Sequence, residues 1–415
     1  MATQRSKLIS ELNASWRNAI DVAVDAAFGE MVEVRQHLHA HPEPSGEEFE
    51  TTRYIVERLD PDTFDLAPGP EGRGVTVQRK GELTGSRIVL RADIDALRIQ
   101  DNKNVAYRST RNGIMHACGH DGHSAVILGA IRALTAAQAD GSLPHYVPWR
   151  AVFQPAEESN EGALAMIRAG VLENARAIIG LHLDPSREVG GVGVRSGTFT
   201  SDCVEIRMRI AGKGGHAARP HESLDPIATA AQLISSIYLF VPRTSDSNDP
   251  IVVSFGQIHG GTSSNVIPDE VRLSGTLRTH RAATRVKTID HINKLSRSLA
   301  EASDTRIEIE YIEGPPALQN DPDLTALIAS EATDVVSAAR VDTIPHPSMG
   351  GEDFANYTAH VPGAMFRLGC ASPGRGAPPL HSPDFDLDPE SLRIGAKILA
   401  RVAVAWSEQQ AAGKE

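Results

Sequence analysis

The stretch "SRIVLRADIDAL" (residues 86–97) is a short apolar run that ends in two aspartates. Such a run is typical of a buried strand that carries polar side chains to the rim of a sheet. Two later stretches repeat the pattern. "WRAVFQPAEE" (149–158) ends in two glutamates, and "ARAIIGLHLDP" (175–185) carries His182 at the end of its apolar run. The sequence therefore predicts three buried strands with polar ends.

Helical patterns separate these strands. "HSAVILGAIRALTAAQ" (123–138) and "EGALAMIRAGVL" (161–172) both have helical periodicity. An alternation of strand and helix predicts an α/β fold with a mostly parallel sheet. Such sheets bind ligands at the carboxyl ends of their strands. Polar residues that fall at these ends are Asp93, Asp95, Glu157, Glu158 and His182.

Near residue 199 the pattern changes. "CVEIRMRIAGKGG" (203–215) alternates apolar and polar residues, which indicates a strand with one solvated face. The segment up to residue 312 predicts a compact α+β unit with a four-stranded sheet and two helices. We therefore expect one catalytic domain, residues 1–198 and 313–415, interrupted by a smaller inserted domain, residues 199–312. Upstream, "HLHAHPEPSGEE" (37–48) predicts that an N-terminal helix ends at His41-Pro42.

Composition excludes several classes of protein. The chain has 415 residues and a formal net charge of -12, which would repel nucleic acid. It has no apolar stretch of the roughly 20 residues that a membrane span needs, and we expect no membrane association. Its three cysteines form no disulfide framework and fit a reducing compartment. We therefore expect a cytoplasmic protein.

"MHACGHDGHSA" (115–125) gathers three histidines, a cysteine and an aspartate. It could be a polar turn before a helix, and Cys118 alone could be a nucleophile, although no signature supports that role. The predicted convergence of Cys118 and His120 with the acidic strand ends favours a metal site instead. Thiolate and imidazole favour zinc, and carboxylate admits manganese or cobalt. The number of ligands allows two divalent ions, and a carboxylate-rich set indicates a catalytic rather than a structural site.

We expect the adjacent acids Glu157 and Glu158 to have different roles. Neighbouring residues that leave a strand point in different directions. One acid can therefore bind metal while the other faces the substrate as a general base. The alternative is a solvated acidic turn.

Seven motifs in order resemble the hippurate hydrolase and N-acyl-amino-acid amidohydrolase family. This family includes the auxin-conjugate hydrolases and belongs to the aminoacylase and carboxypeptidase clan of two-metal peptidases. The resemblance runs from about residue 35 to 405. It rests on "RADIDAL", "MHACGHDGH", "FQPAEE", "GGHAARPHESLDPI", "GGTSSNVIPDE", "GGEDFANY" and "HSPDFD".

The resemblance implies a zinc-peptidase-like catalytic domain and an inserted lid that also forms a homodimer. It implies that Glu157 is the general base for metal-bound water and that Asp95 is an acid that steers the ligands. The metal ligands that it implies are Cys118, His120, Glu158, His182 and His381. Read alone, His381 would be an ordinary loop histidine.

Four residues of the second half are implied in catalysis or substrate binding. The resemblance suggests that His216 reaches across the dimer to the partner's site, and it could instead be a packed loop histidine. It places Asn265 and Arg278 in the substrate region, where arginine binds carboxylate through two parallel hydrogen bonds. Gly351, in "SMGGEDF", allows close approach of the backbone to a ligand, or simply forms a strand-to-helix turn.

The leading hypothesis is an amidohydrolase that releases an amino acid from an N-acyl or N-aroyl amino acid. A metallo-dipeptidase or aminopeptidase is the enzymatic alternative, and a non-catalytic protein that binds metal and ligand is another. The presence of Glu157 disfavours the non-catalytic hypothesis, because a protein that only binds needs no base beside the metal. A zinc nucleobase deaminase is disfavoured because its signature is missing. Arg98 replaces the proline usual in the family, and it either favours acidic substrates or is solvated.

Overall fold

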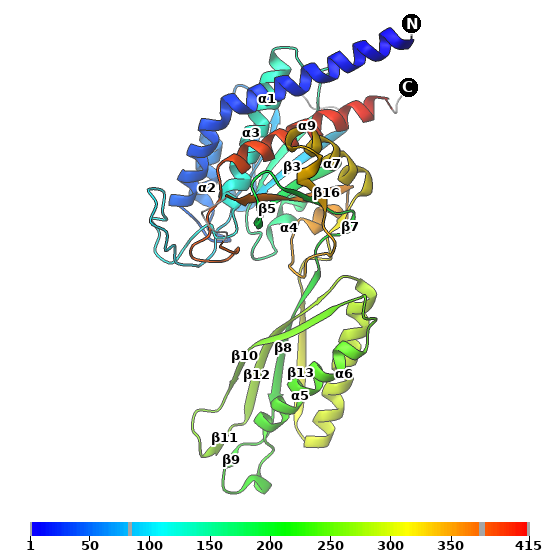
Figure 1. Ribbon diagram of the computed structural model, residues 1–415. Helices are drawn as coiled ribbons and strands as arrows, with labels where there is room; N and C mark the ends of the chain where they lie inside the picture. The colour runs from blue at the N-terminus through cyan, green and yellow to red at the C-terminus, as the bar shows by residue number, and fades with distance from the viewer. Residues whose placement is uncertain (1, 82–84, 373–377, 413–415) are drawn as a thin grey trace. The chain divides into compact units, whose positions relative to one another are not determined.

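The computed structural model describes residues 2–81, 85–372 and 378–412, and these fold into two compact units (Figure 1). The first unit comprises the described residues of 1–197, 319–345 and 356–415. The second comprises residues 198–318 and 346–355. Each unit has its own hydrophobic core.

An eight-stranded mixed sheet forms the centre of the first unit, in the order β1-β2-β4-β3-β5-β16-β6-β15. The three strands expected from the sequence are β3 (Arg87–Asp93), β4 (Trp149–Gln154) and β5 (Ala175–Glu188). They run parallel, with β3 between the other two. On the other side, β16 (Gly363–Ala371) is parallel to β5. The prediction of an α/β fold with a mostly parallel sheet is confirmed.

The edges of this sheet were not expected from the sequence. At one edge β1 (Phe64–Pro68) and β2 (Val75–Arg79) form an antiparallel pair that joins β4. At the other, β6 (Val192–Val194) is antiparallel to β16 and parallel to β15 (Val341–Thr343). These strands are short and have little of the apolar character by which the central strands are recognised.

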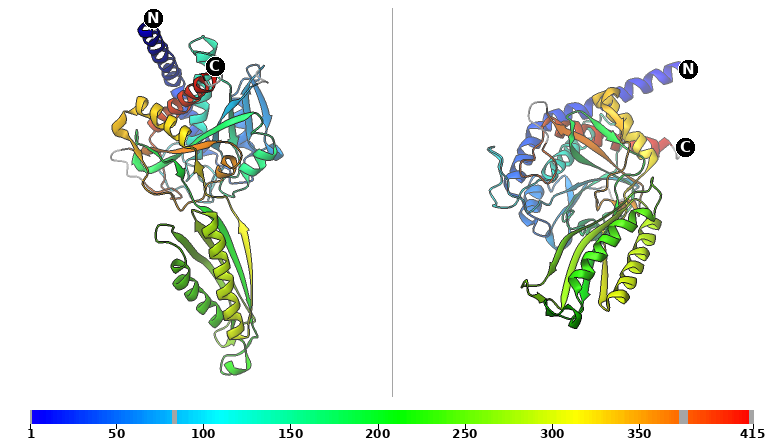
Figure 2. Two further views of the ribbon diagram at one scale, coloured as in Figure 1. Left: turned by 90° about the vertical axis from the view of Figure 1, so that its right-hand side faces the viewer. Right: turned by 60° about the horizontal axis from the view of Figure 1, so that its bottom comes forward.

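Three helices that pack on one another cover the sheet: α1 (Ala2–Ala40), α3 (His120–Ala139) and α9 (Glu390–Ala412) (Figure 2). α3 lies between the other two and is buried almost along its whole length. The remaining helices of four or more residues in this unit, or at its boundary, are α2 (Phe49–Glu57), α4 (Gly162–Arg168), α7 (Pro322–Val336) and α8 (Ala355–Thr358). α7 begins where its sequence favours it, because Asp321 accepts the Leu324 N–H and Pro322 takes the first helical position.

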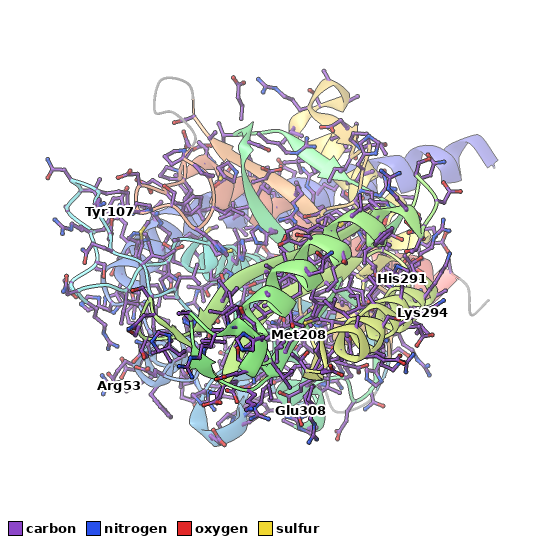
Figure 3. The ribbon with its side chains drawn as sticks, turned by 90° about the horizontal axis from the view of Figure 1, so that it is seen from below. Arg53, Tyr107, Met208, His291, Lys294 and Glu308 are labelled. Atoms are coloured by element: carbon purple, nitrogen blue, oxygen red, sulfur yellow. The ribbon has the colours of Figure 1, made fainter. Side chains whose placement is uncertain are left out.

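The second unit has the predicted four-stranded sheet, which is antiparallel in the order β10-β12-β8-β13. Its elements are β8 (Asp202–Ala211), α5 (Pro226–Phe240), β10 (Ile251–Gly260), β12 (Glu270–Thr279), α6 (Ala282–Ser303) and β13 (Arg306–Glu313). Side chains alternate along β8, where Met208 is buried and Arg209 is exposed and paired with Glu308 of β13 (Figure 3).

Four more short strands complete the chain. β9 (Gly215–His216) pairs with β11 (Val266–Ile267), and β7 (Gly197–Thr198) pairs with β14 (Gln319–Asn320). None of the described helices is both long and apolar enough to cross a membrane.

The crossing of α1, α3 and α9 depends on Gly129. A Cβ added there would lie 2.5 Å from Met31 Sδ and 3.1 Å from Ala396 Cβ. We predict that Gly129→Val lowers the free energy of unfolding by about 1–3 kcal/mol through overpacking. Gly29, in α1, has no atom within 4 Å of the same position. Gly29→Val should therefore change stability by only a few tenths of a kcal/mol, through helix propensity. Denaturant unfolding of both variants tests this, and equal effects would contradict the packing argument.

Candidate metal centre

The polar ends of the central strands meet at one edge of the large sheet. Cys118 lies at the end of the long segment (94–119) that connects β3 to α3, and His120 is the first residue of α3. Gly119 between them has a φ of 88°, a left-handed conformation that favours glycine and allows a sharp turn. Glu157 and Glu158 follow the end of β4 after two intervening residues.

His182 is not at the end of its strand, because β5 continues to Glu188. Its neighbour β3, however, pairs with β5 only as far as Gly180. β3 itself ends at Asp93, two residues after the partner of Gly180, so His182 lies level with the end of β3 and reaches the same edge. His381 comes from a loop that precedes α9, where it has a φ of 60° and its N–H donates to Ala117 O over 2.8 Å.

The five predicted ligands lie close together. Cys118 Sγ is 3.5 Å from His182 Nε2, and His381 Nε2 is 3.4 Å from Glu158 Oε1. Two groups of three have ligand atoms within 4.8 Å of one another: Cys118 with His120 and His182, and Cys118 with Glu158 and His381. The two groups share Cys118, so two ions bound to them would be adjacent. The five residues together supply the donors for both ions.

In His120 and His182, a hydrogen bond holds one ring nitrogen and leaves the other facing this cluster. His120 Nδ1 donates to the backbone oxygen of Asp95 over 2.9 Å and lies 3.1 Å from Asp95 Oδ1. His182 Nδ1 donates to Leu183 O over 2.7 Å. When neutral, each ring therefore keeps its proton on Nδ1 and leaves Nε2 to bind metal, as in histidines that bind metal while an acceptor holds the other nitrogen.

Two buried atoms of the cluster lack a hydrogen bond among the described residues. They are His120 Nε2 and Glu158 Oε1. Burying a polar atom without a partner is costly, so each such atom in a native protein requires an explanation. The donor set of a thiol, imidazoles and a carboxylate fits a divalent cation of the zinc type. A cation here would satisfy both atoms.

The motif's other two buried histidines have different environments. His123 Nδ1 donates to Asp93 Oδ1 over 2.6 Å, and its Nε2 accepts the Leu183 N–H over 3.0 Å. Both nitrogens are therefore used within the protein. Asp93, which the sequence also placed at the strand ends, is bound in addition by Arg91 over 2.6 Å. His116 is buried, and this lowers its pKa to about 4.

Burial and charge set the protonation of the cluster. Burial raises the pKa of the Cys118 thiol well above its usual value. Burial lowers the pKa of His120, but the charge of Asp93 and a hydrogen bond to Asp95 outweigh this and raise it well above the usual range. Burial lowers the pKa of His182 well below it. Burial raises the pKa of Asp95, but hydrogen bonds from His120 and Ser45 reverse the shift and lower it.

Glu157 and Glu158 both face His120. Glu157 Oε2 and Glu158 Oε1 each lie 4.0 Å from His120 Nε2. Glu157 is 8% exposed, so its carboxylate is held at the protein interior rather than in water. Such a carboxylate is placed to take up a proton beside a bound cation.

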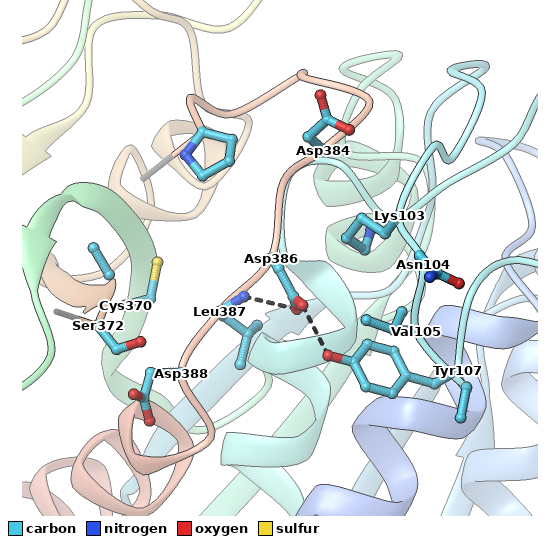
Figure 4. Close-up of a pocket in the computed structure, with 13 residues that line it drawn as sticks. Lys103, Asn104, Val105, Tyr107, Cys370, Ser372, Asp384, Asp386, Leu387 and Asp388 are labelled. Carbon is cyan, nitrogen blue, oxygen red and sulfur yellow. Dashed lines mark hydrogen bonds between the residues drawn. The ribbon is translucent and has the colours of Figure 1, made fainter. Parts of the chain in front are cut away.

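The loop that carries His381 is fixed at its base. Asp386 accepts a hydrogen bond from Tyr107 Oη over 2.8 Å (Figure 4). It accepts another from Arg35 Nη2 over 2.7 Å. A cavity of about 550 Å³ lies beside this loop, lined among others by Lys103 and Cys370. Two of its polar groups, Lys103 and Asp386, are engaged with other protein groups, and we assign the cavity no role.

The four remaining predicted residues belong to the second unit and form two pairs. His216 is in β9 opposite Val266, and the Ala217 N–H donates to Asn265 O over 3.1 Å. Arg278 Nη1 lies 3.2 Å from Cys203 Sγ, and a Cβ on Gly351 would lie 2.8 Å from the same sulfur. The roles of these residues stay predictions.

Arg98 is exposed and forms an ion pair with Glu47 over 2.6 Å. A pair of this kind at the surface matches the solvated alternative, and an effect on substrate choice stays untested. Sequence reasoning missed Ser45 and Glu48, which contact the centre from the loop before α2. The only signal for them was a dense polar segment after the end of the first helix.

Comparisons with known proteins identify the family of the chain. The model of peptidase family M20/M25/M40 matches residues 89–405. The N-acetyl-L-cysteine deacetylase of Bacillus subtilis (strain 168) is 38% identical over 364 residues, 88% of this chain and 85% of the relative. Thermostable carboxypeptidase 1 of Saccharolobus solfataricus is 31% identical, over 91% of this chain and 96% of the relative. Among solved structures, the Bacillus subtilis YXEP protein, described as a dinuclear metal binding peptidase, superposes with a TM-score of 0.78 at 33% identity, over 92% of this chain and 99% of that one.

We predict that Cys118→Ala lowers the affinity for divalent metal by more than about tenfold, because even supporting residues of metal sites contribute that much. Cys370→Ala is the matched control, since Cys370 is also a buried free cysteine but lies outside the cluster. Metal content after dialysis and calorimetric titration with zinc measure the effect. Equal losses in both variants would contradict the assignment of Cys118.

We also predict that metal binding to the stripped protein releases protons. The raised pKa values of Cys118 and His120 mean that both are protonated at neutral pH, and each must lose its proton to bind metal. The lowered pKa of His182 means that it is already neutral. The apparent affinity should therefore rise with pH. Calorimetry in buffers of different ionisation enthalpy counts the released protons, and a pH-independent affinity without proton release would contradict this account.

Proposed function

The chain belongs to peptidase family M20/M25/M40 and is a metal-dependent hydrolase of amide bonds, and we propose that it releases free amino acids from N-acyl or N-aroyl amino acids. The observation that carries this proposal is the pair of buried Glu157 and half-buried Glu158 beside His120, with each carboxylate 4.0 Å from the same unpartnered ring nitrogen. One acid can bind a cation while the other serves as a base.

We assign the metal-binding role to Cys118, His120, Glu158, His182 and His381. Divalent ions bound there would lower the pKa of a water molecule and polarise the amide carbonyl. The native metal in this proposal is zinc, manganese or cobalt, in keeping with the mixed thiol, imidazole and carboxylate donors.

Glu157 performs the proton transfers in this proposal. Its carboxylate takes a proton from the attacking water and later delivers it to the leaving nitrogen of the amino acid. Asp95 acts indirectly, because its carboxylate accepts from His120 Nδ1 and so orients the ring.

The second unit supplies the groups that recognise the substrate in this proposal. Arg278 has neutral partners, Cys203 Sγ at 3.2 Å and Met349 O at 3.1 Å. No carboxylate of the described residues forms an ion pair with it. Its charge is therefore available to the carboxylate of an amino acid. Gly351 lies against the same sulfur and leaves room for the ligand.

His216 and Asn265 stabilise the oxyanion of the tetrahedral intermediate in this proposal. Their imidazole and amide groups can donate hydrogen bonds to an oxygen that becomes negative. We propose that His216 acts on the site of a partner subunit in a homodimer formed through the second unit. Support comes from exposed apolar residues of this unit, which include Ile227, Tyr238, Leu239, Phe240, Ile258 and Val266.

We propose a cytoplasmic location. All three cysteines are free, and a reducing compartment keeps thiols in this state. A free Cys118 is also required if its thiolate is to bind metal.

A metallo-dipeptidase is the second candidate, favoured by the 31% identity to a carboxypeptidase. A free dipeptide carries an α-ammonium group that needs an acidic partner, whereas an acylated substrate needs apolar space. Metal-stripped protein reloaded with zinc, manganese or cobalt should be assayed against N-acetyl, N-benzoyl and indole-acetyl amino acids and against free dipeptides. Metal-dependent release from the acylated substrates supports the proposal. Cleavage of free dipeptides alone would favour the peptidase, and no turnover with metal bound would favour a binding protein.

We predict that Glu157→Gln lowers kcat by about 10²–10⁴-fold or more, the usual contribution of a positioned acid or base, while metal content is unchanged. Glu161→Gln is the matched control, because Glu161 belongs to the same turn but is exposed. It should retain wild-type kcat. A Glu157→Gln variant that keeps near-wild-type kcat would exclude Glu157 as the base.

A further inference from the structure

The loop between α1 and α2 contains a buried acid whose side chain serves neither adjoining helix. Glu48 is 0% exposed, and its Oε1 accepts the N–H of Ala156 over 2.7 Å. Ala156 is the residue immediately before Glu157. The carboxylate thus binds the backbone between the end of β4 and the two acids Glu157 and Glu158.

Ala156 has a conformation that needs external support. Its φ is 53°, in the left-handed region that residues other than glycine rarely adopt. Such backbone persists only where surrounding contacts hold it. Ala156 O accepts the N–H groups of Glu161 and Gly162 over 3.2 and 3.0 Å, and its own N–H is held by Glu48.

Close packing holds the same turn from the other side. A Cβ on Gly162 would lie 1.6 Å from Pro155 O, so only glycine allows the chain to return this closely. The turn is thus fixed by Glu48 at its N–H and by Gly162 at its back. The direction of the next side chain, Glu157, follows from this backbone geometry.

Comparison with Glu43 shows that Glu48 has a distinct task. Both acids belong to the same loop and both are buried. Glu43 Oε2 accepts the Thr51 N–H over 2.7 Å at the start of α2, which is an ordinary contribution to a helix end. Glu48 makes no side-chain cap for that helix. Its second oxygen has no hydrogen bond among the described residues and lies 3.6 Å from Arg73 Nη1.

Burying a carboxylate that has a long ion pair and one oxygen without a hydrogen bond costs stability. If the side chain at this position served packing alone, an apolar residue would fill it at a lower cost in stability. We infer that Glu48 is a positioning residue for the reaction: it holds the Ala156 N–H and thereby aims the Glu157 carboxylate at the water that it deprotonates. This inference rests on the proposed function, in which Glu157 is the general base.

The test compares Glu48→Ala, Glu48→Gln and Glu43→Ala in the full-length, metal-loaded enzyme, with kcat, KM, metal content and thermal stability measured for each. Glu48→Ala should lower kcat by about tenfold to a hundredfold, since small misplacements of a catalytic group cost that much, with KM and metal content unchanged. Glu48→Gln should restore kcat, because its amide oxygen accepts the same hydrogen bond. Glu43→Ala should lower thermal stability and leave kcat unchanged.

Unchanged kcat in Glu48→Ala would overturn the inference, as would a kcat that falls only in proportion to metal content, or a Glu48→Gln variant as impaired as the alanine. If Glu48→Ala does not fold, Glu48→Asp decides, since its carboxylate is one methylene too short to reach Ala156. An unchanged kcat there overturns the inference, and a kcat at least tenfold lower supports it. Wild-type enzyme without amidase activity in the same assays would instead refute the proposed function itself.

Discussion

The Asp95 carboxylate is the constraint on which the rest of this centre depends. It is buried, and it joins three segments that are distant in the sequence. Ser45 Oγ and the Glu158 N–H donate to Oδ2 over 2.7 and 3.0 Å, and His120 Nδ1 lies 3.1 Å from Oδ1. One side chain therefore fixes the loop before α2, the turn after β4 and the first residue of α3. Without it, the ring of His120 and the backbone of Glu158 would lose the hydrogen-bond acceptor that they share.

The central part of this arrangement could be predicted because it follows from periodicity. Apolar runs that end in acids identified β3, β4 and the acids at their ends, and helical periodicity identified α3 after the Cys118 turn. His381 could not be predicted in this way, since it reaches the site from an irregular loop of the distant C-terminal segment. Only resemblance to a family pointed to it.

Other features of the site could not be predicted, because they depend on where partner atoms lie in the folded protein. His120 and His123 are three residues apart in one motif, yet protein atoms use both nitrogens of His123 and leave Nε2 of His120 without a hydrogen bond. Only the positions of their acceptors distinguish them. Glu48 binds a backbone N–H, and any residue at position 156 except proline would provide one. The edge strands β1 and β2 are too short to show a period.

The buried donors of the cluster link metal binding to folding. Polar atoms without partners destabilise the metal-free protein, and a cation that satisfies them binds the folded chain more tightly than the unfolded one. The division into two units separates two tasks of the proposed function. The first unit holds the groups for bond cleavage, and the second holds His216, Asn265 and Arg278, which we propose for recognition and charge stabilisation.

Anomalous diffraction from crystals of the metal-loaded protein tests the central claim most directly. Data collected at the absorption edge of zinc or manganese locate each ion independently of any assay. The account predicts two peaks about 3.5–4 Å apart, each within bonding distance of ligands from the set of Cys118, His120, Glu158, His182 and His381. A peak at another site, or no peak within bonding distance of Cys118 and Glu158, would contradict it.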